Sequence, residues 1–80
     1  MASRFTWNSF IMNYDIGEVL YVYSDDSDKE YAMKMCQEFD NECMIRSVSG
    51  YVNAFICTFS SEIMYNMFCM HIEINKGLER

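Results

Sequence analysis

The sequence has no proline, and glycine, with three residues among 80, is almost as scarce. Alanine and arginine are also rare, whereas asparagine, isoleucine, methionine, phenylalanine and tyrosine are common. The rare amino acids are those with GC-rich codons, so the composition is typical of an AT-rich genome, such as many bacteriophages have. On this ground we expect a protein encoded by a phage or virus.

Long apolar runs are missing as well. No stretch reaches the ~18 apolar residues that a membrane-spanning helix needs, and residues 1–4 are not followed by the apolar segment of a secretory signal. We therefore expect a cytoplasmic protein, in the host cell if a phage encodes it. Its thiols should be reduced, because disulfides persist mainly in oxidising compartments.

The spacing of the cysteines and the histidine does not predict a metal site or a catalytic pair. Neither C-x-x-C nor H-x-x-x-H occurs, so we expect four small buried apolar residues at Cys36, Cys43, Cys57 and Cys69. On a helix, Cys69 and His71 would point about 200° apart and could not act together. Phosphate-binding, dinucleotide-binding and hydrolase motifs are also absent. The sequence predicts a protein that is not an enzyme and uses no metal or cofactor.

Basic residues are few. Six lysines and arginines stand against twelve aspartates and glutamates, which gives a formal net charge of −6. Nucleic-acid binding needs a basic patch that neutralises phosphates, and an acidic surface also repels anionic membranes. The partner we expect is therefore a larger basic protein, most simply one that itself binds nucleic acid.

What the chain does have is apolar material, at 51% of its residues, including six phenylalanines, six tyrosines and a tryptophan. A disordered acidic chain has few aromatics, so a folded core is expected. A β-branched and aromatic run over 18–23 predicts a strand. Residues 43–48 and 51–59 predict a hairpin around Ser49-Gly50. Both faces of the 51–59 strand are apolar, which suggests self-association.

Two helices are expected. The first begins at the capping box of Ser27 and Glu30, and the second runs from Ser60-Ser61-Glu62 to Lys76-Gly77. Its buried stripe is expected to comprise Ile63, Met64, Met67, Phe68, His71 and Ile72. The segment before residue 16 is open to two interpretations. Helical spacing of Trp7, Phe10, Ile11 and Tyr14 favours a short helix, and the alternative is a strand over 4–7.

These elements predict one domain over 1–80 with an α+β fold. We expect a small two-layer sandwich with a three- to four-stranded antiparallel or mixed sheet, packed by two to three helices. The order partly resembles the ferredoxin-like βαββα pattern, but its last strand is missing. An 80-residue domain buries a modest share of its surface, so surplus apolar side chains are expected to bind a partner or a second copy.

The candidate partner-binding residues fall into two groups. Acidic side chains mark the two ends of the first helix, and flexible or aromatic side chains are apolar anchors that a small core cannot hold. The acidic group is Asp25, Asp26, Asp28, Glu38, Asp40 and Glu42. The apolar group is Met33, Tyr65 and Met70.

Two functions follow from these features. The first is an acidic interaction module, an inhibitor of the anti-CRISPR or anti-restriction type, whose carboxylates imitate nucleic acid in the binding groove of a host protein. The alternative is a ligand-binding or regulatory α+β module that forms a homodimer through a sheet edge.

Overall fold

The computed structural model describes residues 5–48, 50 and 53–79. A short 3-10 turn, η1 (Trp7–Ser9), is followed by a hairpin of β1 (Phe10–Asp15) and β2 (Glu18–Val22). Helix α1 (Asp26–Phe39), a second hairpin of β3 (Met44–Val48) and β4 (Ala54–Thr58), and helix α2 (Glu62–Leu78) complete the described chain. No helix among these residues is long and apolar enough to cross a membrane.

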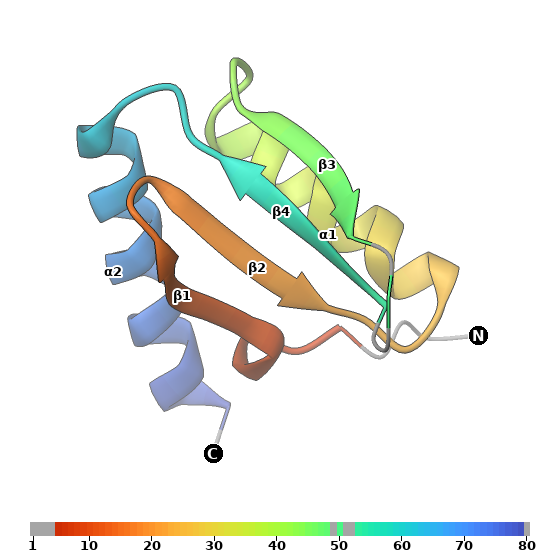
Figure 1. Cartoon of the computed structure of the whole chain (residues 1–80). Helices are drawn as coiled ribbons and strands as arrows, with labels where there is room; N and C mark the ends of the chain where they lie inside the picture. Colours follow the sequence, from red (N-terminus) through yellow and green to blue (C-terminus); the bar gives the residue numbers. More distant parts are fainter. Residues whose placement is uncertain (1–4, 49, 51–52, 80) are drawn as a thin grey trace.

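The strands form one open antiparallel sheet in the order β1-β2-β4-β3 (Figure 1). Helix α1 connects β2 to β3, and β4 lies between these two strands, so this part is a split βαβ unit. The N-terminal β1 adds a further strand beside β2. Both helices lie behind the sheet in Figure 1 and share one core with it. The predicted α+β class is confirmed, and the sheet is antiparallel rather than mixed.

Aromatic side chains fill the space between sheet and helices. Phe68 of α2 lies edge-on to Phe10 of β1, with ring centroids 5.4 Å apart, and 4.8 Å from Phe59 after β4. Tyr21 of β2 lies 5.5 Å from Phe55 of β4. Large rings bury much apolar area at few positions, which lets a chain of this length form a core.

The preferred prediction of a helix around Trp7 to Tyr14 is wrong. Residues Phe10–Asp15 are a strand, which ends in a two-residue turn where Gly17 has φ +77°. The turn brings Asp15 opposite Glu18 and lets β1 pair with β2. The alternative strand over 4–7 is placed too early, and residue 4 lies outside the described residues. Pairing with β2 outweighs a helical spacing that only four residues carry.

The helix ends also differ from expectation. Asp25, not Ser27, is the N-cap of α1, and its carboxylate accepts a hydrogen bond from the Asp28 amide at 2.9 Å. Ser61 caps α2 as the sequence suggests. Helix α2 passes through Gly77 and ends at Leu78, so Gly77 is not a left-handed cap. The predicted 51–59 strand is Ala54–Thr58, and residues 49, 51 and 52 lie outside the described part.

Side chains of α2 bind the backbone of β1 at the edge of the sheet. The Tyr65 hydroxyl donates to the carbonyl of Met12 at 2.7 Å, and the Lys76 ammonium donates to the carbonyl of Phe10 at 3.0 Å. Unpaired strand edges attract other strands. These two bonds therefore protect the β1 edge and fix α2 against it.

The last described residue ties α2 to the start of the fold. The Glu79 carboxylate accepts hydrogen bonds from the backbone N–H groups of Trp7 at 3.0 Å and Asn8 at 3.2 Å. The Thr6 hydroxyl donates to it at 2.9 Å. These bonds lower the pKa of Glu79, although partial desolvation acts to raise it. One carboxylate thus caps η1 from the far end of the sequence.

Candidate protein-interaction surfaces

The acidic residues predicted to bind a partner divide into exposed and buried ones. Asp25, Asp26, Glu38 and Glu42 are exposed. Asp25 also serves as the cap of α1, so its carboxylate is partly committed to the helix. The freely presented acids are therefore those at 26, 38 and 42.

Asp28 does not belong to the surface, because its side chain is only 2% exposed. One carboxylate oxygen lies 3.5 Å from the Tyr21 hydroxyl, and the other lies 3.5 Å from the Ser24 amide. Burial raises the pKa of Tyr21 to about 12, and the nearby Asp28 adds to this shift. The phenol therefore stays protonated and can donate to the carboxylate, which explains how an acid fits under α1.

Asp40 is also buried, at 5% exposure, and is removed from the predicted surface. Its carboxylate accepts hydrogen bonds from the backbone amides of Ser60 at 2.8 Å and Glu42 at 3.1 Å. Burial acts to raise the pKa of Asp40, but these bonds to the charged form outweigh it and the pKa is lowered. The side chain joins the end of α1 to the loop before α2.

The exposed face of α1 is not uniformly acidic. Lys34 is exposed and lies one turn from both Glu30 and Glu38. Such spacing places opposite charges side by side on a helix surface. An unbroken row of carboxylates resembling a phosphate backbone is therefore not present along this face, and the helix offers separate acidic groups near its two ends.

The three predicted apolar anchors have different positions. Met33 is half-buried and packs against the core. Tyr65 is half-buried, and its hydroxyl is bound to β1. Met70 is 63% exposed on α2. Of the three, only Met70 has most of its side chain exposed to solvent.

Met70 belongs to an exposed apolar stripe that the sequence did not reveal. Its members are exposed by between 51% and 78%: Ile63, Met67, Met70, Ile74 and Leu78. We call them the α2 stripe. Of the predicted buried stripe, Phe68 and Ile72 are buried as expected, whereas Ile63, Met67 and His71 are exposed. Because α2 is apolar on two sides, spacing alone could not tell which side faces the sheet.

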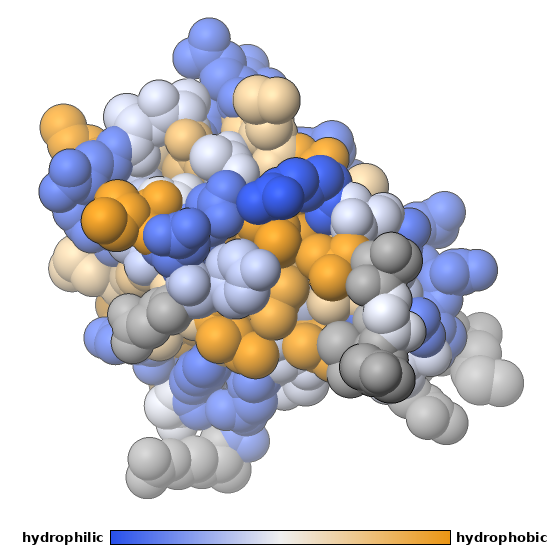
Figure 2. Space-filling view, in the orientation of Figure 1, coloured by the Kyte–Doolittle hydropathy of each residue, from blue (hydrophilic) through white to orange (hydrophobic). Residues whose placement is uncertain are grey.

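A second apolar surface is the face of the sheet that no described helix covers, which we call the open sheet face. Side chains alternate along strands, so Leu20 and Val22 of β2, both half-buried, share this face with Ile56 of β4, which is only 2% exposed. Ile11 and Met44 extend it onto the outer strands. Figure 2 shows apolar side chains gathered at its centre, over β2 and β4.

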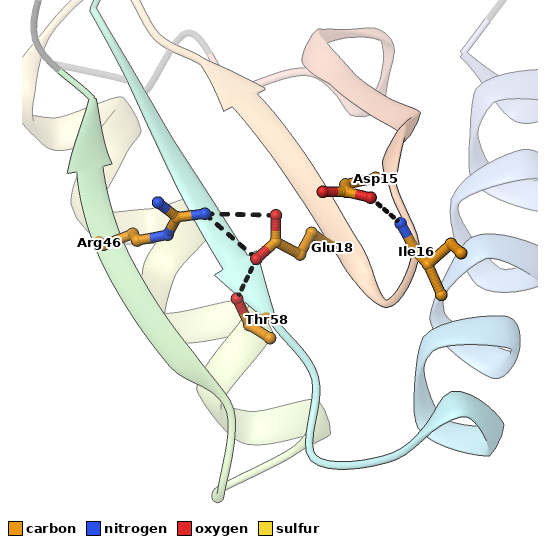
Figure 3. A network of polar contacts seen from close by, with 5 residues as sticks. All are labelled: Asp15, Ile16, Glu18, Arg46 and Thr58. Carbon is orange, nitrogen blue, oxygen red and sulfur yellow. Dashed lines mark hydrogen bonds and ion pairs between the residues drawn. The ribbon is translucent and has the colours of Figure 1, made fainter.

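One polar cluster crosses the open sheet face. The Arg46 guanidinium of β3 lies 3.2 Å from the Glu18 carboxylate of β2, reaching across β4, where Thr58 donates to the same carboxylate at 2.9 Å (Figure 3). At the hairpin turn in the same view, the Asp15 carboxylate accepts a hydrogen bond from the Ile16 amide at 2.7 Å. The cluster links β2, β4 and β3 across this face.

The cysteines offer little chemistry. Cys36 and Cys57 are buried, Cys43 and Cys69 are half-buried, and all four are free thiols. Burial raises the pKa of Cys43 to about 12, and a contact with Cys36 together with burial raises that of Cys57. Both thiols therefore stay protonated at neutral pH and are poor nucleophiles. Among the described residues, no cluster of metal-ligating side chains could hold an ion.

The site thus consists of two apolar surfaces on an acidic chain, the open sheet face and the α2 stripe. Comparison of the chain with protein-family models, with curated proteins and with solved structures finds no match. The functional argument therefore depends on the chemistry of these surfaces.

Proposed function

We propose that this protein is a small acidic interaction module that binds a larger basic protein, most simply as an inhibitor encoded by a phage or virus. The observation that carries the proposal is the open sheet face. Contiguous apolar surface of this kind on a small domain marks a site where another macromolecule binds.

The composition of the open sheet face supports a protein partner. Ile11 and Met44 are exposed large apolar side chains near its two sides, and Leu20 and Val22 lie half-buried between them. A sheet of this kind is normally covered by a second layer. A partner that covers it would bury these side chains as the centre of an interface.

Charge supports a basic partner. The chain carries a net charge of −6, with Asp26, Glu38 and Glu42 exposed. Opposite charge speeds encounter and excludes acidic competitors. The inhibitor would act by steric block. Its apolar face would slow dissociation of the complex, and its acidic side chains would speed association.

The alternative is a homodimeric module that binds a ligand or regulates a partner. The α2 stripe supplies the surface for a second copy that this alternative requires, although a dimer through it is also compatible with an inhibitor. A thermal shift with a small molecule, in the absence of any protein partner, would distinguish it from an inhibitor.

The test begins with capture of a partner from bacterial lysate on the immobilised protein, identification by mass spectrometry, and binding kinetics with the purified partner at low and moderate salt. We expect the D26K/E38K/E42K variant to associate roughly tenfold more slowly at low salt. Its stability should change by no more than about 0.5 kcal/mol per site, because these side chains are solvated.

Two further variants separate charge from apolar contact. K34E adds negative charge to α1 and should associate at least as fast as wild type. M44K places a charge on the open sheet face and should speed dissociation. If the triple reversal and M44K both bind like wild type, and salt has no effect, neither the acids nor the open sheet face binds the partner.

A further inference from the structure

We propose that a second copy of this chain binds the α2 stripe, with the two α2 helices antiparallel about a two-fold axis beside Met70. This interface lies on a different surface from the open sheet face. The proposal therefore does not depend on the proposed function, and either can fail alone.

The arrangement of the α2 stripe is that of a helix-pairing surface. At about 100° per residue, its five side chains fall within an arc of roughly 80°. Phe68 and Ile72, which pack into the core, lie on the other side of the helix. The spacing from Ile63 through Met67 and Met70 to Ile74 alternates four and three residues, as in helices that pack side by side.

The α2 stripe is also complementary to itself. If two copies run antiparallel, Ile63 of one lies level with Leu78 of the other, and Met67 lies level with Ile74. Met70 then lies beside the axis and contacts its own counterpart. Every large apolar side chain meets one of similar size, as a closed two-fold interface requires.

Charge favours a second copy in this orientation. No residue of the α2 stripe is charged. Asn66 and Glu73 lie on one flank of it, and the antiparallel arrangement brings the Asn66 amide of one copy near the Glu73 carboxylate of the other. A parallel arrangement would instead bring the two Glu62 carboxylates to the same end, where like charges repel.

The area available sets the expected affinity. If a fully exposed side chain of this size has an area of about 150 Å², the exposed fractions of the five side chains of the α2 stripe correspond to on the order of 500 Å² per copy. Two copies would bury about 1,000 Å², the lower limit for a specific interface. We therefore expect a dimer with a dissociation constant in the micromolar range, and one that salt strengthens, because both copies are acidic.

The first experiment measures molecular mass by sedimentation equilibrium from low micromolar to high micromolar concentration. Wild type should shift from monomer to dimer, and M70K should remain a monomer at every concentration. Met44 on the open sheet face is 74% exposed, against 63% for Met70, so M44K is the matched control and should dimerise like wild type. A wild type that stays monomeric at moderate salt, or a dimer lost in M44K but not in M70K, would overturn the proposal.

The second experiment tests the orientation by oxidative cross-linking, with wild type as the control for its own cysteines. M70C should form a covalent dimer with itself. I63C alone should not, because the two copies of residue 63 would lie about 22 Å apart. A mixture of I63C and L78C should cross-link. Efficient cross-linking of I63C to itself would show a parallel pair and exclude the proposed arrangement.

Discussion

Asp40 is the residue on which two loops depend. Its carboxylate holds the Glu42 amide just after α1 and the Ser60 amide just before α2. Both hydrogen bonds are part-buried. A buried donor that loses its acceptor costs about 1–3 kcal/mol, so this side chain matters for stability rather than for partner binding.

We therefore expect D40A to lower the free energy of unfolding by about 1–3 kcal/mol in urea denaturation. The exposed neighbour gives the control, since E42A should change it by no more than about 0.5 kcal/mol. Equal effects of the two substitutions would show that the Asp40 carboxylate does not hold the loops.

The lowered pKa of Asp40 predicts how pH acts on the fold. A carboxyl group whose pKa is lower in the folded state stabilises the protein above its unfolded pKa of about 3.9, and this contribution is lost as pH falls through the folded pKa. Wild type should therefore lose more stability on acidification than D40N, which has no proton to gain at this site. Parallel pH profiles of the two proteins would contradict this.

At the scale of elements, two glycines have different backbone conformations. Gly17 turns the β1–β2 hairpin with φ +77°, whereas Gly77 lies within α2. A Cβ atom at either position would meet no neighbouring atom within 4 Å. The effect of adding one is therefore decided by backbone conformation alone.

G17A should destabilise the protein by about 1–2 kcal/mol, because a residue with a Cβ atom is strained in the left-handed region. G77A should stabilise it by about 0.5–1 kcal/mol, because alanine favours the helix more than glycine does. Thermal unfolding of the two variants beside wild type checks both signs. The same sign for both would mean that strain at Gly17 does not govern the hairpin.

The sequence predicts some elements well because their signals are local. The strand at Glu18–Val22 and the cap at Ser61 follow from side chains a few residues apart. The N-terminal segment could not be predicted in this way, because β1 forms only through pairing with β2. Likewise, Asp28 and Asp40 look like surface charges until the fold brings backbone amides and a phenol to them.

The candidate surfaces show the same limit. The sequence of α2 shows that this helix has more apolar side chains than one face can bury, and Met70 was expected to be exposed for that reason. Which of Ile63, Met67, Phe68 and Ile72 faces the core depends on how α2 lies against β1. That position is set by Tyr65 and Lys76, which bind β1 carbonyls more than fifty residues away in the sequence.

For the whole molecule, the two apolar surfaces lie on different elements, one on the sheet and one on α2. If both proposals hold, each dimer would present two open sheet faces. Such a dimer could bind two partner molecules, or two sites on one partner, with an affinity that the monomer lacks. M70K would then weaken binding to a multivalent partner without changing any contact with it.

The hydrogen bonds of Glu79 couple the local stability of η1 to that of the last turn of α2. When α2 frays at its end, the carboxylate moves away and releases the Trp7 amide, so its exchange with deuterium should follow that local opening. The Asn8 amide keeps the Thr6 hydroxyl as an acceptor, so E79A should speed exchange mainly at Trp7 and leave the central amide of Val19 unchanged. We therefore expect η1 and the last turn of α2 to open together, although Glu79 lies more than seventy residues from Trp7 and Asn8 in the sequence.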